Sequence, residues 1–233
     1  MNAENLLVKQ PFDPSPYRER AQALLEKMTV AEKIGQLHLD HVTDCVGLTD
    51  CNLGERASVQ AEADHIRAGG VGTMLLKGRD VANYFQKIAV EESRLGIPLL
   101  FGFDVIHGHK TIFPVPLGEA ATWDPQMLEE AETYAAREAY ADGVNWMYAP
   151  MIDLCRDPHW GRVAEGSGED PLLGSLIAQA KVQGTQVINP VTGAPYVAAC
   201  FKHFCCYGLS QGGRDYEECD ASERTLFMDY MKT

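Results

Sequence analysis

Residues 97–104 read IPLLFGFD, an apolar run that ends in an aspartate and follows a helix-type pattern over residues 80–94. The helix pattern stops at Gly96, and a short apolar run after such a stop is typical of a buried strand. The same step occurs earlier, where a helix pattern over 57–68 ends at a glycine pair and VGTMLL (71–76) follows. Helix-to-strand alternation of this kind indicates an α/β fold.

Three further apolar runs extend the alternation on both sides of these segments. They are IGQLHL (34–39), VNWMYAPMID (144–153) and YVAACFKHF (196–204). A helix is predicted over 16–28, and a second one begins at a capping box formed by Thr29 and Glu32. Further helices are predicted from Asp124-Pro125 to Ala141, from Asp170-Pro171 to about residue 183, and from a start near Ser222. Because the strands are apolar throughout, we expect a parallel sheet that is covered on both faces.

Polar side chains follow every one of the five apolar runs. They are Asp40 and His41; Lys77; Asp104, His107 and His109; Asp153 through Arg162; and Lys202 with His203. A doubly wound sheet uses mainly one switch point, whereas a TIM-type (β/α)8 barrel brings all its strand ends to one rim, so the barrel is favoured. Such a barrel needs about 250 residues. We therefore expect an incomplete barrel of about five β/α units over residues 16–233, preceded by an extension over 1–15.

Composition and charge limit the classes of partner that the chain is expected to bind. The chain of 233 residues has 33 acidic and 20 basic side chains and a net charge of −13. This charge disfavours nucleic acid and anionic membranes and fits a neutral substrate. The N-terminus has no leader-type pattern, and the seven cysteines include no CxxC pair, so we expect reduced thiols and a cytoplasmic location. No cofactor is indicated, and composition leaves the oligomeric state open.

Asp104 and the Lys202-His203 pair are the strongest candidates for chemistry. A carboxylate at the end of an apolar strand needs hydrogen-bond donors, which two adjacent sugar hydroxyls, a helix N-terminus or a cation can supply. A lysine at such a position is a fixed hydrogen-bond donor, an ion-pair partner of Asp104 or Asp153 across the rim, or a Schiff-base amine. All of these interpretations are open from the residues alone.

The other candidates are weaker. The Gly-rich loop HWGRVAEGSGEDP (159–171) holds three carboxylates against the single cation Arg162, which disfavours phosphate and favours a neutral polyol. Asp170 is expected to be only a helix N-cap. His107 and His109 have the spacing of a metal pair, but no third ligand stands at a familiar spacing, so we expect no metal there. Arg214, in GGRDY (212–216), is a candidate binding residue or a surface residue.

Several strings, taken together and in order, resemble glycoside hydrolase family 3, and its β-glucosidase branch in particular. They are KMTVAEKIGQL (27–37), GGVGTMLL (69–76), SRLGIPLLFGFDVIHGHKTIFPVPLGEAATWDP (93–125), APMIDLCRDPHWGRVAEGSGEDP (149–171), FKHF (201–204) and GGRDY (212–216). The resemblance begins near residue 17 and implies a TIM-type barrel whose rim binds the non-reducing sugar of a β-glycoside in a retaining hydrolase.

The resemblance also implies roles for individual residues. Asp104 is similar to the family's carboxylate that binds sugar hydroxyls, Arg162 to its sugar-binding arginine, and Lys202 and His203 to its KH pair, with Arg214 as a further contact at the same subsite. The nucleophilic aspartate and the acid/base glutamate have no match in this chain. We therefore expect the N-terminal part of a β-glucosidase, with no catalytic residue in the chain itself and no hydrolysis by the chain alone.

Three alternatives remain. A β-xylosidase or related exo-β-glycosidase of the same family would share this part of the barrel. A lyase that uses Lys202 as a Schiff base would need a carbonyl substrate. A fragment that binds sugar without catalysis would show weak glucoside binding and no turnover.

Overall fold

A computed structural model describes residues 15–41 and 56–232, and it divides into two compact units, Met1–Phe101 and Gly102–Thr233. Cys45, Cys51 and all of the expected N-terminal extension except Ser15 lie outside the described residues. No helix in the described ranges is long and apolar enough to cross a membrane.

The first unit alternates helices with short parallel strands. Its elements are α1 (Ser15–Lys27), α2 (Val30–Gly35), β1 (Leu39–His41), α3 (Ala57–Arg67), β2 (Thr73–Leu75), α4 (Arg79–Lys87), a π-helical turn (Ile88–Glu92) and the start of β3 (Leu100–Phe103). β1 pairs with β2 in parallel, with Asp40 opposite Met74. The amide of Leu100 donates to the carbonyl of Gly72 at 3.1 Å, which joins β3 to β2.

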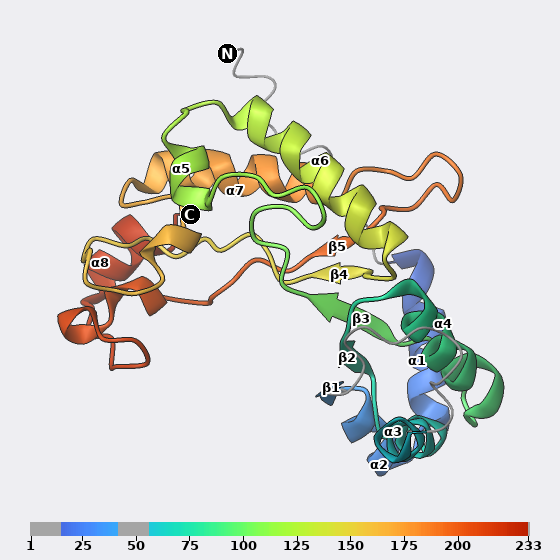
Figure 1. Ribbon diagram of the computed structural model, residues 1–233. Coiled ribbons are helices and arrows are strands. Elements are labelled where there is room, and N and C mark those ends of the chain that lie inside the picture. Colours follow the sequence, from blue (N-terminus) through green and yellow to red (C-terminus); the bar gives the residue numbers. More distant parts are fainter. Residues whose placement is uncertain (1–14, 42–55, 233) are drawn as a thin grey trace. The chain divides into compact units, whose positions relative to one another are not determined.

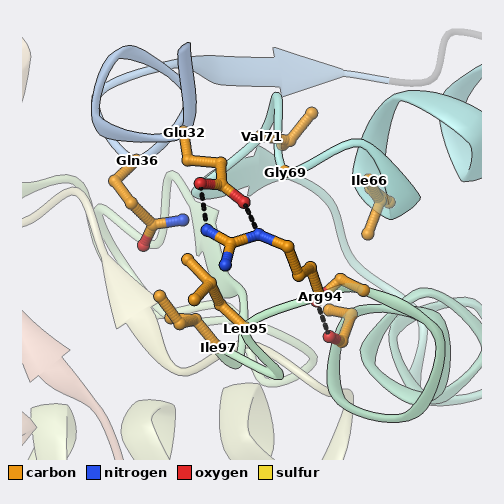
Figure 2. A pocket seen from close by; sticks show the side chains of 10 residues that line it. Glu32, Gln36, Ile66, Gly69, Val71, Arg94, Leu95 and Ile97 are labelled. Atoms are coloured by element: carbon orange, nitrogen blue, oxygen red, sulfur yellow. Dashed lines mark hydrogen bonds and ion pairs between the residues drawn. The ribbon is translucent and has the colours of Figure 1, made fainter. Parts of the chain in front are cut away.

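Helix α2 starts where the sequence predicts, and its first turn is tied to a distant segment. Glu32 accepts a hydrogen bond from the Thr29 amide at 2.8 Å, and the Thr29 hydroxyl accepts one from the Glu32 amide at 3.2 Å, which completes the predicted capping box. Figure 2 shows the guanidinium of Arg94 meeting the same carboxylate with Nε at 2.9 Å and Nη2 at 2.6 Å. These two hydrogen bonds to one buried carboxylate hold the first turn of α2, which precedes β1, against the segment that leads into β3.

The second unit continues the pattern. Its elements are the end of β3, α5 (Pro116–Ala120), α6 (Pro125–Ala141), β4 (Trp146–Met147), a 3-10 turn η5 (Val163–Glu165), α7 (Pro171–Thr185), β5 (Ala198–Ala199), two 3-10 turns (Tyr207–Leu209 and Gln211–Gly213), α8 (Glu223–Thr225) and a π-helical turn (Leu226–Tyr230). Phe103 of β3 is opposite Met147 of β4, which is opposite Ala199 of β5, and both pairings are parallel. In Figure 1, α6 and α7 lie side by side along these strands.

The core of the second unit is a layer of small residues on α6 against the strands. Val105, Ala135, Ala136, Ala139, Val144, Met147 and Val197 are buried together. Asp124 and Asp170 cap α6 and α7 by accepting hydrogen bonds from Met127 N and Leu173 N, so both predicted Asp-Pro helix starts are confirmed. Small side chains on α6 let the helix approach the sheet closely, which positions the ends of β3, β4 and β5.

The hydrogen-bonded strand order, followed through β3, is β1-β2-β3-β4-β5. A sequential, all-parallel order without reversal is that of a barrel wall and not that of a doubly wound sheet. The predicted fold class, an incomplete TIM-type α/β barrel, is therefore supported by the topology.

Two details of the strand prediction are wrong. The first strand begins at Leu39, five residues after Ile34, because residues 34–38 complete α2 and the turn that follows it. The strands are also not covered on both faces: Leu39, Leu75 and Leu100 are 48%, 38% and 46% exposed. The inside of a complete barrel is filled by layers of side chains from facing strands, and in the described residues no such layer covers these three leucines.

Candidate sugar-binding site

The ends of β3 and β5 bring the two strongest candidates into direct contact. Lys202 Nζ donates to Asp104 Oδ1 at 2.6 Å, although the two residues are 98 positions apart. Strand-like pairing continues beyond β5, since the Lys202 amide donates to Pro150 O at 3.0 Å and its carbonyl accepts from the Ile152 amide at 2.7 Å. This pairing fixes the lysine backbone. The ion pair is one of the open interpretations of Lys202 and is confirmed.

His203 is held from behind by a buried carboxylate. Asp153 is 1% exposed at its side chain and accepts from His203 Nδ1 at 2.8 Å and from the His203 amide at 2.9 Å. Because a carboxylate only accepts, Nδ1 carries a proton, and Nε2 is the ring nitrogen left to contact a ligand. The ring is one-third exposed. Asp153 therefore orients His203 for a contact through Nε2.

Arg162 lies in the same region, but its guanidinium is directed at the carboxylate of Glu165. Its Nε and Nη2 each donate to Glu165 at 2.7 Å, and its guanidinium lies 5.6 Å from the centre of the Tyr207 ring. This bidentate pair raises the pKa of Arg162 and holds the pKa of Glu165 below its usual value, with Lys202 and His203 adding smaller contributions to the latter. The arginine and its carboxylate thus belong to the same electrostatic cluster as Lys202 and His203.

Tyr207 connects the parts of this cluster. Its ring meets that of His203 edge-on at 4.9 Å, and its hydroxyl donates to Asp215 at 2.6 Å. The indole of Trp160 donates to the same oxygen of Asp215 at 2.9 Å. Desolvation and the bond to Asp215 raise the pKa of Tyr207 to about 12, so its hydroxyl keeps its proton at neutral pH.

Arg214 is placed apart from the other four candidates. Its side chain is 73% exposed, and its Nε lies 3.8 Å from Glu217 Oε2. The loop itself docks through Gly213, whose φ is +66° and where a Cβ would collide with His159 and the Trp160 backbone. Because Gly213 lets the loop approach this backbone closely, Asp215 lies within the cluster, whereas Arg214 lies at its edge.

His107 and His109 do not converge. His107 Nδ1 donates to Phe113 O at 3.0 Å, whereas His109 Nε2 donates to Asp142, at the end of α6, at 2.9 Å. The two imidazoles therefore hold a loop in place.

A cavity of about 200 Å³ lies beside the cluster and shares His203 and Asp153 with it. Its other walls are largely apolar, from Phe201, Phe204 and Tyr230 among others, together with Cys205 and Cys206. Asp104 and Lys202 do not line this cavity, and Asp104 is half exposed. The charged pair thus faces an open rim, with an ammonium, an imidazole, a guanidinium and carboxylates as hydrogen-bonding groups. Such a mixed set of donors and acceptors suits a neutral polyhydroxyl ligand.

Sequence reasoning considered Asp153 only as a candidate ion-pair partner of Lys202, and it assigned no role to Tyr207. Asp153 ends an apolar run, as Asp104 does, and that signal was available to single it out. Tyr207 follows the Lys-His pair in an irregular loop, where no spacing rule marks it.

Comparison with known proteins shows the family to which the chain belongs. The model of the glycosyl hydrolase family 3 N terminal domain matches residues 29–233. A periplasmic beta-glucosidase of Salmonella typhimurium is 37% identical over 98% of this chain and 28% of its own length. A putative beta-xylosidase of Formosa agariphila is 30% identical over 89% of this chain and 29% of its own.

A solved structure gives the same result for the fold. A mutant of the beta-glucosidase of Listeria innocua, solved in complex with laminaribiose, superposes with a TM-score of 0.79 at 36% identity, over 92% of this chain and 30% of that one. The same enzyme has been solved with glucose, where the TM-score is 0.79 at 35% identity. This chain spans less than a third of the length of these relatives. The chain belongs to glycoside hydrolase family 3, and the part of the family that it matches is the N-terminal domain.

Proposed function

We propose that this chain is the part of a retaining β-glucosidase that binds the terminal non-reducing glucose residue of a β-glucoside. Similarity to the beta-glucosidases of Salmonella typhimurium and Listeria innocua supports it, the latter having been solved with glucose and with laminaribiose. The observation that carries the proposal is the Asp104–Lys202 pair at 2.6 Å on joined strand ends, beside an oriented His203.

The roles in this proposal follow from hydrogen-bond chemistry. The Asp104 carboxylate accepts from two adjacent hydroxyls, the Lys202 ammonium donates to a hydroxyl that Asp104 also holds, and His203 uses Nε2. Arg162 donates through the guanidinium nitrogen that Glu165 leaves free. Arg214 extends the subsite from its exposed loop after it leaves Glu217.

In this proposal the chain contributes binding groups and not the reacting groups. Retaining hydrolysis needs a nucleophilic carboxylate and an acid/base carboxyl about 5–5.5 Å apart. The family resemblance assigns neither to a residue of this chain. Contacts to sugar hydroxyls that strengthen in the transition state accelerate the reaction only when those two groups are present.

β-Xylosidase activity is the second candidate, because a putative beta-xylosidase is among the relatives at 30% identity. Xylose lacks the hydroxymethyl group of glucose, so the two candidates differ in whether the site makes favourable contact with that group.

Two further interpretations fit less well. A Schiff-base lyase needs a neutral lysine, whereas Lys202 is paired with a carboxylate and is therefore placed as a hydrogen-bond donor. A fragment that binds sugar without catalysis would make the same contacts as a β-glucosidase fragment. The two interpretations differ only in the larger protein to which the chain belongs.

Binding to the 233-residue chain tests the proposal. Glucose and xylose are titrated into ¹⁵N-labelled chain, and amide shifts near Lys202 and His203 are followed. Saturable binding that is lost in Asp104→Asn and kept in Asp220→Asn, an exposed aspartate of the same unit, supports the site. Stronger binding of glucose than of xylose supports the glucosidase. Equal binding by wild type and Asp104→Asn contradicts the assignment.

The domain limits and the location are also proposals. We propose that residues 16–233 act as one barrel-type domain behind an extension over 1–15; the family match over 29–233 supports this. A cytoplasmic location is the second of these proposals, and two relatives that are named periplasmic give the competing location. Fractionation of cells that express the natural gene separates the cytoplasm from the periplasm.

A further inference from the structure

A second group of ligand-type side chains lies in the first unit. His38 directly precedes β1 and Asp40 lies in it, so in extended chain these two residues, two positions apart, place their side chains on the same face. Glu62 and His65 are three positions apart on α3, so they share one face of the helix. A Glu-x-x-His pair on a helix is a known way of presenting a carboxylate and an imidazole to one metal ion.

The strand pair and the helix pair face each other. One ligand atom from each of His38, Asp40 and His65 lies within 4.8 Å of the others. His65 Nδ1 and Asp40 Oδ2 are 3.4 Å apart, which is about the ligand-to-ligand spacing around a tetrahedral ion with bonds of about 2.0–2.1 Å. The two imidazole rings lie with their centres 5.4 Å apart.

The hydrogen bonds around the cluster leave the required atoms available. His38 Nδ1 donates to Gly70 O at 3.1 Å, which fixes the tautomer and leaves Nε2 as the ligand atom. The Glu62 side chain reaches Asp40, while its Oε1 is buried without a hydrogen-bond partner in the described part of the chain. Gly70 lets the His65 ring pack on the backbone, because a Cβ there would collide with the ring. The cluster thus offers two imidazoles and the Asp40 carboxylate, with one oxygen of the neighbouring Glu62 unsatisfied.

We propose that His38, Asp40 and His65 bind a divalent first-row transition-metal ion, Zn²⁺ by preference, with Glu62 as a second carboxyl that orients Asp40 from outside this group of three. Two imidazoles with carboxylates suit Zn²⁺, whereas Mg²⁺ and Ca²⁺ prefer sites made only of oxygen. The ion cross-links β1 to α3 and stabilises the first unit. At a hundredfold excess over the dissociation constant, bound Zn²⁺ raises Tm by roughly 5–10 °C.

The test is metal binding by the 233-residue chain. Metal-free protein is titrated with Zn²⁺ against a chromophoric chelator, and Co²⁺ is added in parallel to record the visible bands of a tetrahedral complex. We expect one equivalent of Zn²⁺, no competition by Mg²⁺, and a loss of affinity of at least tenfold in His38→Gln and in His65→Gln. His41→Gln is the matched control, since His41 is exposed on the same strand and outside the cluster.

Two results overturn the proposal: no saturable Zn²⁺ binding by the wild type, or unchanged affinity and unchanged Co²⁺ bands in both His38→Gln and His65→Gln. The exposed ring of His38 makes that variant safe for folding, which a melt without metal verifies. If His65→Gln fails to fold, the Co²⁺ spectrum of His38→Gln alone decides between a metal site and a plain Asp40–His65 ion pair.

Discussion

Replacing Lys202 by methionine separates a binding role from a structural one. Lys202 Nζ lies 2.6 Å from Asp104 Oδ1, but the Asp104 side chain is 52% exposed, so water screens the pair. Ion pairs of this kind contribute no more than about 1 kcal/mol to stability. Lys202→Met should therefore lower Tm by at most roughly 2–4 °C.

The effect on sugar binding should be much larger. A hydrogen bond to a charged group contributes about 1.5–3 kcal/mol, which corresponds to a roughly 10- to 150-fold loss of affinity for glucose. The assay is the NMR titration with glucose, together with thermal melts of the same samples. Lys110→Met is the matched control, because Lys110 also pairs with an aspartate, Asp142 at 3.4 Å, and is 63% exposed.

A double-mutant cycle with Asp104→Asn completes the experiment. If both residues contact the same sugar, the losses in binding free energy are not additive, since either change disrupts the shared hydroxyl contact. A large loss of stability with unchanged glucose binding in Lys202→Met would refute the reasoning and show that the pair holds β3 and β5 together instead.

Further predictions concern the scaffold and the chemistry. Lys181 is buried between Glu119 at 2.6 Å and Glu132 at 2.9 Å, so Lys181→Met should cost about 3–5 kcal/mol in urea unfolding. Burial raises the pKa of Glu132, so that deficit should shrink as the pH falls toward the unfolded glutamate value of about 4.3. Hydrogen bonds from Arg94 and Thr29 lower the pKa of Glu32 to about 2, so its contribution is complete above pH 4.5 and is lost as the pH falls toward 2. Glu32→Gln should flatten acid unfolding in this range, and an unchanged acid limb would contradict it. Borohydride should trap no carbonyl compound on Lys202, as mass spectrometry of the treated chain will show. The 233-residue chain by itself should not hydrolyse nitrophenyl β-glucosides; turnover that disappears on mutating Asp153 or Glu165 would show that the reacting carboxylates lie within it.

Much of the secondary structure follows from local sequence. The helix starts at Thr29, Asp124 and Asp170 lie at the caps that the sequence predicts, because a cap depends on a side chain and an amide two or three residues away. The order of helices and strands follows from hydrophobic periodicity, which is local too. The strand boundaries cannot be predicted in this way. Residues 34–38 were expected to begin the first strand, but they complete α2 and the turn that follows it.

Some features of the candidate site also follow from local sequence, and others depend on the tertiary structure. The sequence by itself placed Asp104, Lys202 and His203 after apolar runs, and parallel strands bring such positions to one edge. Only the tertiary structure decided that Lys202 pairs with Asp104, that the buried Asp153 orients His203, and that Arg214 stays outside while Asp215 enters. It alone brought His38 and Asp40 to His65. The physical reason is that caps and periodicity depend on near neighbours along the chain, whereas these pairings depend on strand register and on how closely α3 and the 212–216 loop pack.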